Sequence, residues 1–157
     1  MNLDLIKKTI FIRAWALVKV PMIAWLRPKV LEMSDHKVEI AIPLSRRSKN
    51  HLNSMYFGAL AAGADVAAGV AAVSEIIKSK QKISFAFKSL RAEFFKRAED
   101  QTHFVCTQPK EVAALVTKAI ASGEREEMPI KVTAYTPRKF AEEAVAEFEL
   151  VLSMRRK

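Results

Sequence analysis

The sequence contains a single cysteine, Cys106, among 157 residues. One thiol excludes a disulfide within the chain, and no stretch combines an apolar run with the small-residue cleavage site of a signal peptide. We therefore predict a cytoplasmic protein. Half of the residues are hydrophobic and 27% are charged, which is typical of a folded domain and not of a disordered tail. The length suits one core, so we predict a single domain over residues 1–157, with residues 1–27 as an N-terminal helical segment.

Metal-binding spacing is also absent. The three histidines, His36, His51 and His103, are not spaced as metal ligands with one another or with Cys106. The sequence therefore predicts no metal site.

Acidic residues are fewer than basic ones, 17 against 26, and the net charge is +9. Lysine and arginine in such excess can bind the phosphates of nucleic acid, of lipid headgroups or of a phosphorylated ligand, or can simply keep a protein soluble. Here they are spread along the chain, without zinc-finger spacing or the aromatic and basic motif that stacks single-stranded RNA. We therefore do not expect nucleic acid as a partner.

Glycine is scarce, and three of the four glycines (Gly58, Gly63 and Gly69) fall within residues 56–77. The same 22 residues hold eight alanines, and their only charged residues are Asp65 and Glu75. A helix that is apolar on all sides must be enclosed, and small side chains let neighbouring strands approach it closely. We predict that this segment is the central helix of the fold.

The N-terminal residues 3–20 have the spacing of an amphipathic helix that Pro21 kinks or ends. We expect its apolar face to cover the core; that face comprises Leu3, Ile6, Ile10, Ala14, Leu17 and Val18. The stretch 10–26 is too short and too charged for a membrane span, since it includes Arg13 and Lys19. A helix resting on a membrane surface is the less favoured alternative.

The remaining segments predict several strands and one short helix. Residues 38–44 alternate as a half-buried strand, and Pro43 suggests that its end lies at a sheet edge. Further predictions are a long strand over 83–94 bent near Lys88 and Ser89, a strand over 102–107, a helix from Pro109 to Gly123, a loop over 123–129, and neighbouring antiparallel strands over 130–136 and 146–154. Successive strands without a helix between each pair indicate an α+β fold with an antiparallel sheet.

The run from Asn50 to Gly58, with the helix that follows, resembles the loop and central helix of hotdog-fold thioesterases of the phenylacetate-degradation type. Asn50, Gly58 and Asp65 match the family's Asn, second Gly and helix carboxylate. Tyr56 and Phe57 stand where its His and first Gly are usual, as in a poorly characterised branch of the fold. Residues 90–97 are similar to its long central strand. The resemblance implies a curled antiparallel sheet wrapped around the long helix, with an extra N-terminal helix and a short helix between later strands.

Physical chemistry gives Asp65 and the helix start separate roles. A carboxylate inside an apolar helix costs several kcal/mol unless it meets water, a donor or a cleft. The helix start offers unpaired N–H groups and a positive dipole end that can polarise a thioester carbonyl. The two features are roughly 10–15 Å apart along the helix, so one chain cannot bring both to one carbonyl. A two-fold dimer would solve this, and the resemblance implies such a homodimer or a dimer of dimers.

The resemblance implies a thioesterase acting on an acyl-CoA or on an acyl-carrier protein, with coenzyme A as part of the substrate and no other cofactor. Asp65 would be the general base or, less favoured, the nucleophile, and the N–H of Phe57 or Gly58 would hold the oxyanion. Asn50 would orient the water or the carbonyl. The residues expected to contact the substrate are Tyr56, Ser54 and Arg91. Arg91 is one of several basic candidates for binding the CoA phosphates.

Structural interpretations stay open for the same residues. Asp65 could be a carboxylate bonded to a loop, Asn50 a turn residue and Tyr56 a packed aromatic, while Ser54 fits a helix N-cap better than a nucleophile. Two other functions also remain: a non-catalytic binder of fatty-acyl groups, and a peripheral membrane protein that reaches lipid through residues 1–27.

Overall fold

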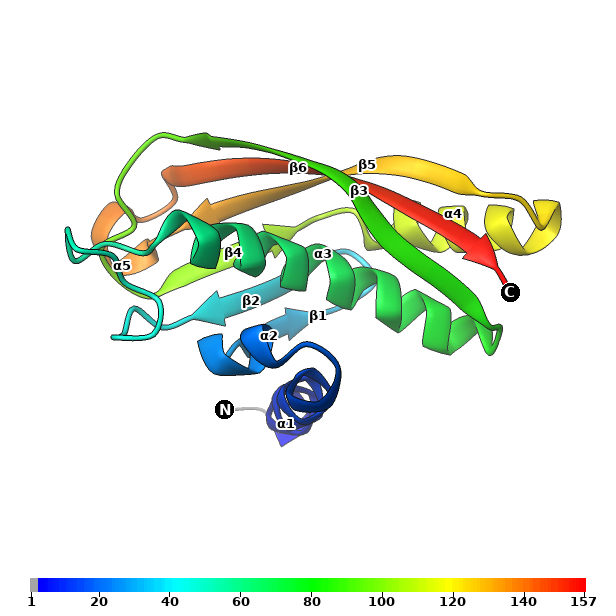
Figure 1. Cartoon of the computed structure of the whole chain (residues 1–157), viewed down its shortest axis with the longest axis horizontal. Helices are drawn as coiled ribbons and strands as arrows, with labels where there is room; N and C mark the ends of the chain where they lie inside the picture. Colours follow the sequence, from blue (N-terminus) through cyan, green and yellow to red (C-terminus); the bar gives the residue numbers. More distant parts are fainter. Residues whose placement is uncertain (1–2) are drawn as a thin grey trace.

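A computed structural model describes residues 3–157, so the first two residues of the predicted segment 1–27 lie outside the described part. One curled antiparallel sheet wraps around a long helix, α3 (Figure 1). The elements are α1 (Leu3–Lys19), α2 (Pro21–Leu26), β1 (Lys29–Met33), β2 (Val38–Ile42), α3 (Phe57–Ser79), β3 (Ile83–Phe94), β4 (Thr102–Cys106), α4 (Pro109–Ser122), β5 (Glu126–Tyr135), α5 (Pro137–Phe140) and β6 (Ala144–Arg156). This arrangement confirms the hotdog fold.

The six strands follow the order β1-β2-β4-β5-β6-β3, and every pair is antiparallel. The long strand β3 pairs with β6 alone and forms one edge of the sheet. Its register shifts between Phe87 and Ser89, which confirms the predicted irregularity near Lys88. A bulge bends the strand locally, so β3 can follow the curl of the sheet around α3.

The helix α3 lies against the concave side of the sheet and buries ten of its residues, mostly alanines. Its small side chains permit close packing: a Cβ placed on Gly63 would lie only 2.3 Å from Cζ of Phe104, on β4. By length and composition α3 could cross a membrane, but helices in the core of a folded protein have the same length and composition. Half of the most apolar 18-residue stretch of α3 is buried in this fold. The central helix predicted for residues 56–77 is therefore confirmed, with the bounds Phe57–Ser79.

Two predictions about the strands need correction, and one strand had no residues assigned to it. Residues 126–129, predicted as loop, pair with Val151–Met154 on β6. The charged side chains on the solvent-facing side of this half-buried strand give it the composition of a loop. Pro43 does not mark a sheet edge, because β2 pairs on both sides and ends at Ile42, before the proline could interrupt a ladder. The strand β1 was not predicted as a separate element, and only Val30 within it is fully buried.

The helix α1 was predicted at the right place but with the wrong face inward. The predicted inward residues Leu3, Ile10, Leu17 and Val18 are between 62% and 76% exposed. The row that packs inward contains Leu5, Thr9, Ile12 and Ala16. Because α1 lies beside β1 at the sheet edge and not over the sheet (Figure 1), only this narrow row reaches the core. Thr9 belongs to it because its hydroxyl accepts a hydrogen bond from the backbone N–H of Val30 at 3.0 Å.

Candidate functional site

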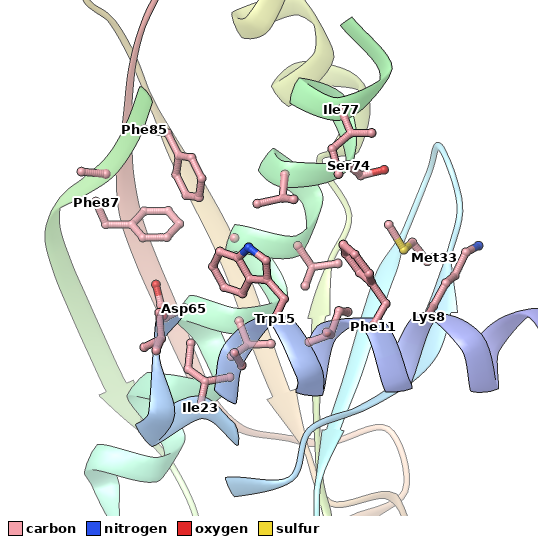
Figure 2. A pocket seen from close by; sticks show the side chains of 18 of the residues that line it. Lys8, Phe11, Trp15, Ile23, Met33, Asp65, Ser74, Ile77, Phe85 and Phe87 are labelled. Carbon is pink, nitrogen blue, oxygen red and sulfur yellow. The ribbon is translucent and has the colours of Figure 1, made fainter. Parts of the chain in front are cut away.

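A cavity of about 530 Å³ lies between α1, α3 and β3 (Figure 2). Its walls are almost entirely apolar, and among the described residues that line it Asp65 is the one carboxylate. Two aromatic side chains come from α1, Phe11 and Trp15, and two come from β3, Phe85 and Phe87. The dimensions and lining are those of a small-molecule site.

Asp65 projects from α3 at one end of the cavity, close to Phe87 and Ile23 in Figure 2. Within residues 3–157 its carboxylate has no hydrogen-bond or ion-pair partner, and burial alone raises its pKa above the usual value for aspartate. Desolvation of this kind makes a carboxylate a stronger base. The structural interpretation, a bond to a neighbouring loop, has no support in the described chain.

The start of α3 presents two unused backbone donors. Tyr56 is the N-cap residue, and its carbonyl accepts hydrogen bonds from the N–H groups of Ala59 and Leu60 at 2.9 and 3.0 Å. The N–H groups of Phe57 and Gly58 have no acceptor in the described part of the chain. Together with the positive end of the helix dipole, they form a place for a developing negative charge.

The loop before α3 is held by Asn50. Its Oδ1 atom accepts hydrogen bonds from the N–H of Leu52 (2.9 Å), the N–H of Ser54 (3.2 Å) and the hydroxyl of Ser54 (3.3 Å). Ser54 is buried within this loop and is not the N-cap, which corrects that prediction. The Ser54 hydroxyl donates its hydrogen bond to Asn50 Oδ1 and so does not cap α3, because local side-chain acceptors compete with the helix end for such hydroxyls. The Asn50 oxygen therefore serves the loop that sets the position of the helix start.

The aromatic pair at the helix start is exposed. The rings of Tyr56 and Phe57 lie 4.7 Å apart, and the side chains are 48% and 62% exposed. The Tyr56 ring also covers Gly58, where an added Cβ would come within 2.6 Å of it. Neither aromatic residue lines the cavity around Asp65. Both side chains therefore lie at the surface of this chain.

Arg91 lies apart from the other predicted site residues. It is paired with Glu93 at 3.1 Å, is largely exposed, and borders a shallow polar depression with Lys131 and Glu149. The structure thus does not bring Arg91 to the Asp65 cavity. Among residues 3–157, no three His, Cys, Asp or Glu side chains gather as metal ligands would.

Within one chain the two halves of the predicted site remain separate. Asp65 follows Gly58 by seven residues, or about 10 Å of helix, and Gly58 does not line the cavity. The sequence interpretation did not identify the cavity walls on α1. Phe11 and Trp15 are four residues apart and share a helix face, which is the signal that could have identified them.

The family model for a domain of unknown function, DUF4442, matches residues 8–152. No curated protein matches the chain. Among solved structures, a protein of unknown function from Chlorobaculum tepidum TLS is similar with a TM-score of 0.83 at 9% identity, covering 98% of this chain and 97% of its own. A Pseudomonas aeruginosa protein of unknown function, called a probable thioesterase, has a TM-score of 0.75 at 19% identity, covering 95% and 96%. A thioesterase from Haemophilus influenzae has a TM-score of 0.62 at 11% identity, covering 85% and 82%. At these identities the likenesses show a shared fold, the hotdog fold described above.

Proposed function

The chain belongs to the DUF4442 family, and we propose that it is a thioesterase acting on acyl groups carried by coenzyme A or by an acyl-carrier protein. The observation that carries the proposal is the unpaired carboxylate of Asp65 at one end of an apolar cavity. A thioester has the two parts that such a site can accommodate, an apolar acyl chain and a carbonyl that water can attack.

In the proposed reaction, Asp65 accepts a proton from a water molecule as the water oxygen bonds to the thioester carbon. The negative charge on the carbonyl oxygen is stabilised by the N–H groups of Phe57 and Gly58 of a second copy of the chain, since those of the same chain are too far from its Asp65. The carbon–sulfur bond then breaks, the proton passes from Asp65 to the sulfur, and a carboxylic acid and a thiol are released. Asn50 contributes by fixing the loop that precedes these donors.

A homodimer through the β3 edge would bring the two halves of the site together. Within residues 3–157 this edge has no partner strand, and from Ala86 to Phe94 most of its residues are exposed. Antiparallel pairing of two copies centred on Leu90, the middle of that exposed stretch, would set Phe94 of one chain opposite Ala86 of the other. Within each chain the start of α3 lies near the end of β3, since the N–H of Met55 donates a hydrogen bond to the carbonyl of Ala98 at 2.7 Å. Because Ala86 lines the Asp65 cavity, this pairing would bring the α3 start of one chain towards the Asp65 cavity of the other.

Replacing Leu90 with Asp tests this dimer. At the centre of the pair the two new carboxylates would face each other, so we expect association to weaken by roughly tenfold or more. Sedimentation should show monomer in place of dimer, and thiol release should fall with it. Leu17→Asp makes the same change on an exposed position of α1 and should alter neither. A Leu90→Asp protein that stays dimeric and active would contradict the proposed interface.

The second candidate function is non-catalytic binding of fatty-acyl groups. It is favoured by Tyr56 and Phe57, which replace the His and Gly of the resembling family. Measuring thiol release from acyl-CoAs of several chain lengths separates the two functions. Turnover supports the thioesterase, whereas binding without release of coenzyme A from any of them supports the binder.

A further inference from the structure

We propose that the cavity beside Asp65 accommodates a long, unbranched aliphatic acyl chain, which lies along α3 from Asp65 towards Ile77 with α1 as its wall. The inference rests on the proposed function only for the thioester group at the Asp65 end. The shape and the wall chemistry of the cavity point to its occupant independently of any reaction.

The chemistry of the walls selects an aliphatic group. Apart from Asp65 and Ser74, α3 contributes only apolar side chains, and the lysines of α1, Lys7 and Lys8, can add their aliphatic stems at the rim. A polar or charged acyl group would lose hydration here without finding hydrogen-bond partners. A hydrocarbon chain would instead remove apolar wall from water along its whole length.

The length of the cavity selects a long chain. Its α3 wall runs from Asp65 to Ile77, twelve residues, which is about 18 Å at 1.5 Å per residue. With bonds of about 1.5 Å in a zigzag, that distance corresponds to an extended chain of roughly 14 carbons. Figure 2 shows Asp65 and Ile77 at different ends of the cavity, with Trp15 and Phe85 between them.

Gly69 lies on the cavity wall between these ends, and nothing in the fold requires a glycine there. Its backbone is helical and not left-handed, and an added Cβ would meet only Phe87 Cε2, at 4.0 Å. Glycine inside a helix is less favourable than alanine by about 0.5–1 kcal/mol. Neither packing nor conformation offsets that cost, so we infer that the missing side chain leaves space for the ligand.

The opposite wall is held in a defined position. Thr9 and Arg13 fasten α1 to the chain around β1, since Arg13 Nε donates a hydrogen bond to the Pro28 carbonyl at 2.8 Å and Thr9 accepts one from Val30. Phe11 and Trp15 belong to the same helix and face the cavity. The first helix therefore bounds the space that an acyl chain can fill.

Trp15 makes the proposal measurable without turnover. The chain has two tryptophans, and Trp25 is 58% exposed and does not line the cavity, so Trp25→Phe leaves Trp15 as the only reporter. We would titrate this variant with alkyl-CoA thioethers of 4 to 16 carbons, which cannot be hydrolysed. Trp15 emission should change on binding, and the affinity should rise by up to about fourfold per methylene until the chain reaches roughly 14 carbons. Equal affinity for all lengths would overturn the proposal.

Gly69→Leu in the same background should shorten the longest chain that still gains affinity by several carbons, and Gly69→Ala should do so by less. Ala114→Leu, on the exposed side of α4, adds a leucine away from the cavity and should leave the profile unchanged. An unchanged profile in both folded Gly69 variants would contradict the inference. Length-dependent binding without thiol release from acyl-CoAs would reject the thioesterase but keep this inference. Thiol release together with binding that does not depend on chain length would keep the thioesterase but reject this inference.

Discussion

Replacing Asp65 with Asn should lower kcat/KM for thioester hydrolysis by about 10²–10⁴-fold, the usual contribution of a positioned general base. The amide has nearly the shape of the carboxylate but cannot accept the proton from water. The cavity should therefore still bind an acyl chain, and the loss should appear in kcat. The measurement is thiol release from the best acyl-CoA, with Trp15 emission reporting binding.

The matched control is Asp35→Asn. Asp35 is exposed, its hydrogen bond from Lys78 lowers its pKa, and it lies outside the cavity. Its replacement should leave the rate within about twofold, since surface changes away from a site have small effects. An Asp65→Asn protein as fast as the wild type would reject the general base.

The raised pKa of Asp65 also predicts that its carboxylate lowers the stability of the folded protein at neutral pH. The unfolded chain ionises this group near its ordinary pKa of 3.8, whereas the folded protein does so only at higher pH because burial disfavours the charge. Stability is therefore lost as pH rises from the unfolded pKa to the folded one. Asp65→Asn should unfold at higher urea than the wild type at pH 7, and the difference should disappear below pH 3.8. A variant less stable than the wild type at pH 7 would show that the carboxylate has a stabilising partner.

Features that depend on the residues of a single segment could be predicted from the sequence. The central helix follows from its composition, and Asp65 stands out because it is a charge among alanines. The face of α1 could not be read in this way, because both of its sides are apolar and the inward row contains a polar residue, Thr9. Its burial depends on a hydrogen bond to Val30, which only the folded chain provides.

The loop before α3 also depends on a side-chain hydrogen bond that the sequence does not reveal. Ser54 has the residue type of an N-cap, but it lies two residues before the actual N-cap, Tyr56, and its hydroxyl donates a hydrogen bond to Asn50 four residues earlier. Local side-chain bonds of this kind compete with capping, and sequence alone does not decide between them. Likewise, the spacing of Phe11 and Trp15 indicates an aromatic face on α1, but only the folded chain shows that this face meets α3 and β3 to form a cavity.

Gly63→Ala should destabilise the protein strongly, although alanine favours helices. The new Cβ would lie 2.3–2.6 Å from three atoms of the Phe104 ring, closer than such atoms approach in folded proteins. Phe104 is fully buried on β4, so the ring cannot move out into solvent. Overpacking a core of this kind costs about 1–3 kcal/mol or more, which exceeds the propensity gain of alanine. Urea unfolding followed by circular dichroism would measure the loss.

Gly69→Ala is the matched control on the same helix. There the nearest atom to an added Cβ is 4.0 Å away, so the change should stabilise the protein by about 0.5–1 kcal/mol. Adding Phe104→Leu to Gly63→Ala should restore part of the lost stability, because the smaller side chain removes the ring that the new methyl group meets. The coupling energy of this double-mutant cycle should be favourable. Additive losses would mean that the close approach of α3 to β4 is not what requires glycine at position 63.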